Sequence, residues 1–189
     1  MNPILVDFPE KIETERLYFR PCLPGDGKIV HEAIAVSRDS LKKWLPFAVK
    51  EETVEEVEAG IRASFAEFIN RSDFRLHIYL KENHLFVGSI GLHRINWDIK
   101  KFEIGYWCDS RQIKNGYITE AAEALTAFCF EHFKANRVEI RCDEKNIDSR
   151  RIPERLGFPL EGILRNDSLA TDNISLRSTC VYAKVKVDD

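Results

Sequence analysis

The sequence predicts an α/β (α+β) fold, a single domain in which a mixed sheet carries helices on its faces. Segments rich in strand-forming residues alternate with segments whose apolar residues recur at helical spacing. The chain has 189 residues, of which 44% are hydrophobic and 31% charged, so that one sizeable core can form. We therefore treat residues 1–189 as one domain.

Strand-forming residues open the first half of the chain, and the turn-forming segment PCLPGDG ends that strand. Three helices are expected next, and Pro46 stops the second of them. Three antiparallel strands follow, because short turn-forming segments separate them. The predicted strands are residues 14–22, 74–80, 85–95 and 101–108, and the predicted helices are 28–36, 37–45 and 51–69.

The second half alternates helices with strands. An apolar stripe that includes Ala121, Leu125 and Cys129 predicts a helix over 117–133. A short helix over 149–156 ends at Gly157, because glycine commonly terminates helices. Strands are predicted at 138–142, 158–164 and 175–187. The predicted order of elements is β-α-α-α-β-β-β-α-β-α-β-β.

Composition argues against several classes of protein. The net charge of -3 is unlike that of a dedicated nucleic-acid binder, and no apolar run is long enough for a membrane helix. The N-terminus MNPILVDFPEK lacks the pattern of a signal peptide. The cysteines are Cys22, Cys108, Cys129, Cys142 and Cys180. None of them forms a CxxC pair, so we expect no metal site. We expect the thiols to be free and buried, as in a protein of the reducing cytoplasm.

The segment from Glu103 to Gly157 is the most informative part of the chain. A strand leads into a short basic turn that ends at Gly116, and an amphipathic helix follows. Backbone amides of such a turn and of a helix N-terminus bind anionic groups, and glycine lets the backbone approach a phosphate closely. The segment therefore indicates an enzyme with a phosphorylated cofactor. Taken alone, the turn is better explained as an ordinary strand-to-helix connection.

Several motifs in order give a more specific indication. They are TERLYFRP (14–21), LFVGSIGLHRI (85–95), EIGYW (103–107), NGYITEA (115–121), NRVEIRC (136–142) and the segment from Asn146 to Gly162. With these motifs the chain resembles the GNAT acetyltransferases, in particular the RimJ/RimL type that acetylates the N-termini of proteins, including ribosomal proteins. The resemblance implies the GNAT fold, with a mostly antiparallel sheet splayed at two strands. It also implies a substrate-side half of about 1–100 and an acetyl-CoA-binding half of about 101–166.

Acetyl-CoA is the co-substrate that the resemblance implies. The family's turn pattern, Arg/Gln-x-x-Gly-x-Gly/Ala, occurs here with Lys114 in place of the first glycine, which adds a cation near the expected pyrophosphate. The pantetheine arm is expected to pair with the backbone at the end of the strand 101–108, as an added strand would. The residues expected to contact the cofactor are Trp107, Cys108, Arg111, Lys114, Asn115, Gly116, Ile118, Thr119, Asn146 and Arg150.

Two residues are the expected catalytic groups. The resemblance suggests Glu103 as general base, acting directly or through water, although an ion pair with Arg94 or Arg141 would equally explain a glutamate there. Many relatives carry a tyrosine that reprotonates the coenzyme A thiolate, and Pro153 occupies its place here. In RimL-like proteins a serine has been assigned that role, and this serine corresponds to Ser149. Asn146 or Ser149 could also serve only as a helix N-cap.

One departure from the family pattern concerns the general base. RimL-like enzymes carry a catalytic glutamate where this chain has Ser168, and Asp167 is no simple substitute, because neighbours on a strand point to opposite faces. The base is therefore Glu103, water or another carboxylate, or the enzyme acts on a different substrate.

The acceptor is expected to be a primary amine, foremost a protein N-terminus, which attacks the thioester directly in a ternary complex. Trp44 resembles part of the family's apolar acceptor motif, although residue frequencies favour a helix end packed on the core. The alternatives are a small-molecule acetyltransferase for a polyamine, an amino acid or an aminoglycoside, and a coenzyme-A-binding module without catalysis. The sequence leaves a homodimer open.

Overall fold

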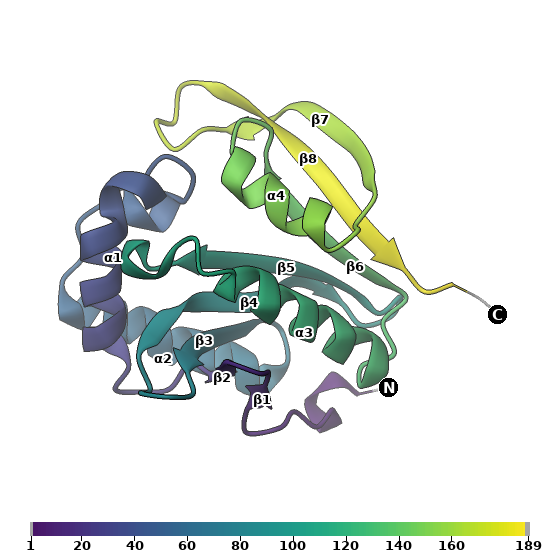
Figure 1. The fold of residues 1–189 in the computed structure, drawn as a ribbon, viewed down its shortest axis with the longest axis horizontal. Helices are drawn as coiled ribbons and strands as arrows, with labels where there is room; N and C mark the ends of the chain where they lie inside the picture. Colours follow the sequence, from purple (N-terminus) through teal and green to yellow (C-terminus); the bar gives the residue numbers. More distant parts are fainter. Residues whose placement is uncertain (1, 188–189) are drawn as a thin grey trace.

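Helices cover both faces of one sheet in the computed structural model, which describes residues 2–187 (Figure 1). The strands are β1 (Ile12–Glu13), β2 (Leu17–Pro21), β3 (Phe74–Leu80), β4 (Phe86–Asn96), β5 (Lys101–Cys108), β6 (Arg137–Asp143), β7 (Leu160–Leu169) and β8 (Leu176–Val185). The α-helices are α1 (Gly27–Leu41), α2 (Val54–Asn70), α3 (Tyr117–Glu131) and α4 (Ile147–Arg155). Three short 3₁₀ helices are η1 (Pro3–Leu5), η2 (Pro46–Ala48) and η3 (Ser110–Gln112).

The strands follow the order β1-β2-β3-β4-β5-β6-β8-β7 across the sheet. The β5–β6 pair is parallel, and the other six pairs are antiparallel. The predicted fold class, a mixed and mostly antiparallel sheet flanked by helices, is therefore confirmed. The short strand β1 was not predicted, and β7 extends beyond the predicted end at 164.

Helix α1 runs through the point where the sequence predicts a boundary between two helices. The residues around Ser37 include no proline or glycine to interrupt the hydrogen-bond ladder, and Ser37 itself is buried. Its hydroxyl oxygen accepts a hydrogen bond from the amide of Ser110 at 2.8 Å, which ties α1 to η3. The predicted second helix is therefore wrong, and Pro46 begins the 3₁₀ helix η2.

Alternate residues of β5 face opposite sides of the sheet. Phe102 and Ile104 belong to the apolar cluster that includes the buried stripe of α3, whereas Trp107 packs against the cluster of α1 and α2. Helices α3 and α4 thus lie on one face and α1 and α2 on the other (Figure 1). We call them the α3 face and the α1 face.

The parallel pair β5–β6 opens along its length. Its ladder runs from Lys101↔Arg137 to Ile104↔Ile140 and ends there. Beyond this point β5 continues to pair with β4 as far as Cys108, and β6 continues to pair with β8 as far as Asp143. The backbone edges of the two strands that face each other beyond Ile104 are left free for another extended chain. This confirms the predicted splay at two strands.

Candidate active site

The turn between β5 and α3 is held by a buried carboxylate. Asp109 is buried, and it accepts hydrogen bonds from the backbone amide and the guanidinium of Arg111 at 2.6–3.0 Å. Arg111 also donates to Glu32 of α1 at 2.8 Å. Hydrogen bonds to Asp109 and Glu32 raise the pKa of Arg111, which is already a permanent cation. The Arg111 side chain thus braces the turn.

The amides at the start of α3 lie beside two left-handed residues. Lys114 has φ +66° and Gly116 φ +80°, so the lysine adopts a left-handed backbone conformation that glycine adopts most readily. The first helical hydrogen bond runs from the amide of Glu120 to the Gly116 carbonyl. In the described part of the chain no side chain caps this helix, so the amides of 117–119, including those of Ile118 and Thr119, can bind an anion.

The segment between β1 and β2 holds this turn in place. The carbonyl of Asn115 accepts a hydrogen bond from Arg16 at 3.0 Å, and the Asn115 side chain donates to Gln112. Arg16 and Thr14 both bind the carboxylate of Glu120, at 2.7 Å and 2.6 Å. The TERLYFRP motif, whose function the sequence did not reveal, therefore holds the start of α3 in place.

On the α3 face, Tyr106 and Ser149 meet across the splay. The Tyr106 hydroxyl donates to the Ser149 carbonyl at 3.0 Å, and the Ser149 hydroxyl lies 3.4 Å from the Tyr106 oxygen. Pro153 lies inside α4 and has no N–H to give to that carbonyl, so the tyrosine takes the place of the missing donor. Burial raises the pKa of Tyr106 well above its usual range, so the phenol stays protonated. Sequence reasoning did not assign a function to Tyr106.

Asn146 and Arg150, at the start of α4, bind other groups of the protein in this structure. Asn146 is the N-cap, and its side chain accepts a hydrogen bond from the amide of Ser149 at 3.2 Å. The guanidinium of Arg150 donates to the Tyr182 hydroxyl at 3.1 Å and to the Glu144 carbonyl at 3.2 Å. The N-cap interpretation of Asn146 is thus confirmed, and it does not exclude contact with a ligand through the amide NH₂.

On the α1 face, Glu103 forms the ion pair that the sequence left as an alternative. Its carboxylate accepts a hydrogen bond from Arg94 at 3.1 Å, and its side chain is 14% exposed. A bulge between β4 and β5 follows the pair His93↔Glu103, and Arg94 there has φ +45°. The bulge turns Arg94 towards the face of Glu103, since bulges re-aim side chains locally.

His93 lies next to Glu103, and its imidazole packs against the backbone of two glycines. A Cβ at Gly105 would lie 2.8 Å from the ring of His93, and a Cβ at Gly91 would lie 2.9 Å from it. Gly91 and Gly105 are paired on β4 and β5, so together they leave room for the imidazole against the backbone. The Nδ1 of His93 lies 2.7 Å from the carboxylate of Asp73. Sequence reasoning assigned no role to any histidine.

Aromatic side chains border the α1 face beyond Glu103. Trp107 packs against Phe86 and Phe47, with ring centroids 5.8 Å and 6.1 Å away. Trp44 is half-buried in the turn after α1, and the nearby Phe47 of η2 is the residue in contact with β5. The backbone of Cys108, at the end of β5, pairs with Gly88.

A second bulge brings Asp167 to the same face. The register of β7 shifts between Leu164 and Ser168, and Asn166 there has φ +53°. The carboxylate of Asp167 lies 3.5 Å from the guanidinium of Arg141, and Ser168 accepts a hydrogen bond from Arg177 at 2.8 Å. Simple alternation, which would place Asp167 opposite to Ser168, therefore does not hold here, because the bulge interrupts it.

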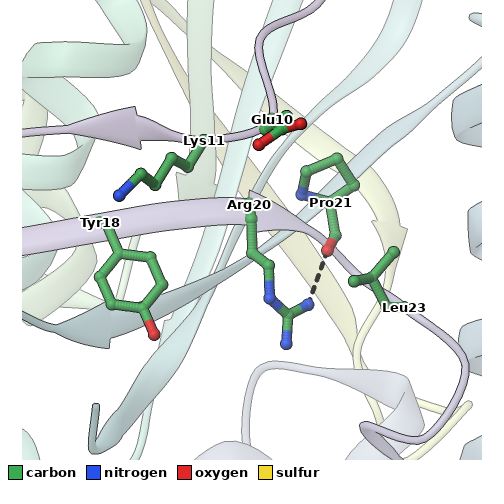
Figure 2. A pocket seen from close by; sticks show the side chains of 6 residues that line it. All are labelled: Glu10, Lys11, Tyr18, Arg20, Pro21 and Leu23. Atoms are coloured by element: carbon green, nitrogen blue, oxygen red, sulfur yellow. Dashed lines mark hydrogen bonds between the residues drawn. The ribbon is translucent and has the colours of Figure 1, made fainter.

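The hollow in Figure 2 lies at the other end of the sheet, along β1 and β2, and has a volume of about 390 Å³. It is lined by Glu10, Lys11, Tyr18, Arg20, Pro21 and Leu23. Its inner cation, Arg20, donates to the Pro21 carbonyl and to Asp26. Since the β5–β6 splay lies three strands away, this hollow is separate from the candidate site.

Family comparison defines the class of protein. Residues 16–159 match the acetyltransferase (GNAT) domain family, so the chain belongs to the GNAT family. It is an N-acetyltransferase, and acetyl-CoA is its acyl donor, as the resemblance implied. Within residues 2–187 no cluster of His, Cys, Asp or Glu is arranged to hold a metal, and none of the helices described there could span a membrane.

Two of the relatives are named as ribosomal acetyltransferases. The chain is 31% identical over 156 residues to "Putative ribosomal N-acetyltransferase YdaF" of Bacillus subtilis, which covers 80% of this chain and 82% of the relative. A ribosomal-protein-serine acetyltransferase of Escherichia coli is 33% identical over 98 residues, 52% of this chain and 54% of that one.

Solved structures share the fold at low sequence identity. RimL, a ribosomal L7/L12 α-N-protein acetyltransferase in complex with coenzyme A, has a TM-score of 0.86 at 19% identity and covers 93% of this chain and 98% of its own. The microcin C7 self-immunity acetyltransferase MccE, in complex with acetyl-CoA and AMP, has a TM-score of 0.88 at 20% identity, over 95% and 98% of the two chains.

Proposed function

We propose that this enzyme transfers the acetyl group of acetyl-CoA to the α-amine of a protein N-terminus, such as that of a ribosomal protein, in the cytoplasm. The names of YdaF and of RimL support this acceptor class. The observation that carries the proposal is the β5–β6 splay, which has hydroxyl groups on its α3 face and a carboxylate and an imidazole on its α1 face. A thioester in the splay could then be attacked from one face and release its thiolate towards the other.

The cofactor would lie along the α3 face. In this proposal the amides of 117–119 bind the pyrophosphate, with Gly116 allowing close approach and Lys114 adding a positive charge. The pantetheine arm pairs with the free edge of β5 near Trp107 and Cys108, and Asn146 offers its amide group to the arm. Arg111 and Arg150 act indirectly, because their guanidinium groups already bind protein partners.

Ser149 is the proposed donor to the leaving thiolate. Its hydroxyl lies on the α3 face at the mouth of the splay, and Tyr106 fixes its backbone. A donor placed where negative charge develops lowers the barrier for departure of sulfur. On the α1 face Glu103 is the carboxylate next to the incoming amine, and Trp44 borders the acceptor.

Transfer would be direct, without an acylated cysteine. Burial raises the pKa of Cys142, which neighbours Ser149, to about 12. Burial likewise raises the pKa of Cys108 to about 12. Both thiols are therefore protonated at neutral pH and poor nucleophiles. The rate enhancement would come from holding amine and thioester together.

Release of free coenzyme A across a panel of amines tests this proposal. The panel contains peptides with free N-terminal serine or alanine, the same peptides with acetylated N-termini, and spermidine. We expect thiol release with the free peptides, loss of release with the blocked ones, and a rise of the thermal midpoint with acetyl-CoA. Preferential turnover of a small amine would favour the small-molecule alternative. Cofactor binding without any release would indicate a non-catalytic module.

A further inference from the structure

His93 occupies a position on the α1 face directly over the point where the splay begins. Gly105 is the first residue of β5 after the last β5–β6 pair, Ile104↔Ile140. A Cβ built on Gly105 would lie 2.8 Å from Cδ2 and 3.1 Å from Nε2 of His93, so the Nε2 edge of the ring lies over this residue. The imidazole is 37% exposed and can therefore be reached by an acceptor.

Asp73 determines which ring nitrogen of His93 can act as a base. The carboxylate lies 2.7 Å from Nδ1, and an ionised carboxylate can only accept a hydrogen bond. The Nδ1 of His93 therefore carries the proton, and in the neutral ring Nε2 presents its lone pair. A carboxylate that orients an imidazole and stabilises its protonated form is the arrangement that general bases use.

The charged groups around His93 come from three strands. β3 contributes Arg75 two residues after Asp73, β4 contributes Arg94, and β5 contributes Glu103, the Cα partner of His93. The Glu103 carboxylate is already bound by Arg94 at 3.1 Å, whereas Nε2 of His93 lies free over Gly105. Among these groups, the imidazole is therefore the one placed to accept a proton from an incoming amine.

We propose that His93 is the general base of the acetyl transfer, oriented by Asp73, with Glu103 as a neighbouring carboxylate that attracts the ammonium group. This inference rests on the proposed function. The bound ammonium group first loses a proton to Nε2 of His93, which passes it to solvent, and this frees the nitrogen lone pair. The lone pair then forms the bond to the acetyl carbon, and the C–S bond breaks with its electron pair on sulfur. As the amide forms, the nitrogen loses its second proton through Nε2 to solvent. The thiolate takes a proton from the Ser149 hydroxyl, which regains one from solvent.

The pH dependence of kcat/KM tests the assignment. Two acceptor peptides whose N-terminal amines differ in pKa are compared. A limb of the pH–rate profile that lies at the same pH for both peptides reports a group of the enzyme, because a limb from the substrate amine would move with its pKa. We expect a fixed limb between pH 5 and 8, where imidazoles titrate, rather than near pH 4. His93→Gln should lower kcat by about 10²–10⁴-fold, abolish the limb and leave the KM for acetyl-CoA within about twofold.

Substitutions of Asp73 and Gly105 test the assignment of His93 independently. Asp73→Asn removes the neighbouring carboxylate and should move the limb to lower pH as well as lower kcat. Gly105→Ala should lower kcat, because its Cβ would displace the ring, whereas Gly162→Ala on β7 is the matched control with nothing within 4 Å of the new Cβ. The rise of the thermal midpoint with acetyl-CoA shows in each case that the variant is folded.

The outcomes separate this inference from the proposed function. If the wild-type enzyme releases no coenzyme A with any amine, the proposed function falls and the assignment of His93 falls with it. If turnover is normal and the limb survives in His93→Gln, or disappears only in Glu103→Gln, the acetyltransferase stands and the assignment of His93 is wrong. A limb lost in His93→Gln and shifted in Asp73→Asn supports it.

Discussion

Replacing Tyr106 by Phe removes a hydroxyl that serves Ser149, and the effect can be worked out from three residues. The tyrosine donates to the Ser149 carbonyl at 3.0 Å, and Pro153, four residues further on, has no N–H that could replace it. A buried carbonyl that is left without a hydrogen bond costs about 1–3 kcal/mol. We therefore expect Tyr106→Phe to lower the free energy of unfolding by about that amount, and kcat to fall because Ser149 loses its orientation.

A double-mutant cycle isolates this mechanism. Pro153→Ala adds an N–H that can donate to the Ser149 carbonyl within α4, so in that background Tyr106→Phe should cost at least about 1 kcal/mol less. Urea unfolding of the four proteins, followed by circular dichroism at pH 7, measures the coupling. Tyr18→Phe, whose hydroxyl contacts His84 in the turn between β3 and β4, is the control and should be additive with Pro153→Ala. Additivity of Tyr106→Phe within about 0.5 kcal/mol would refute the reasoning.

Three further changes have defined expectations. Gly116→Ala should cost about 1–2 kcal/mol through its left-handed backbone and weaken acetyl-CoA binding in a titration, while Gly162→Ala does neither. Glu103→Gln should raise the KM for the amine more than it lowers kcat, and a larger loss in kcat would identify Glu103 as the base. Burial raises the pKa of Asp26, but hydrogen bonds from Arg20 and His77 outweigh it and lower the pKa well below its usual range. Urea unfolding should therefore show stability that is present above about pH 4 and lost as pH falls, and Asp26→Asn should reduce this slope.

The sequence was sufficient for elements whose signals are local. The turn before α3, the helix stop at Gly157 and the alternation of β5 can each be predicted from a few consecutive residues, and the structure contains all three. The predictions that failed depend on contacts between residues far apart in the chain. The α1 boundary failed because propensity alone cannot show that Ser37 is buried and bonded to Ser110, a contact 73 residues away in the chain.

The role inferred for His93 could not be predicted for the same reason. Its partner Asp73 is on the connection before β3, and the two glycines beneath its ring come from β4 and β5. Only the register of three strands brings these residues together. One indication was present in the sequence, since Gly91 and Gly105 lie inside segments predicted to be strands, where glycine often marks the close approach of another group.

The alternation of side chains along β5 gives the candidate site its chemical asymmetry. Glu103 and Gly105 face α1 and leave room for an imidazole beside a carboxylate, while Tyr106 faces α3 and meets the hydroxyl of Ser149. Attack on a thioester needs a proton acceptor beside the nucleophile and a proton donor beside the leaving sulfur, and the two must not neutralise each other. A sheet that separates them, opened at the β5–β6 splay so that a thioester can lie between its faces, meets both requirements. This is why the splay, more than any single side chain, supports an acetyltransferase without an acyl-enzyme.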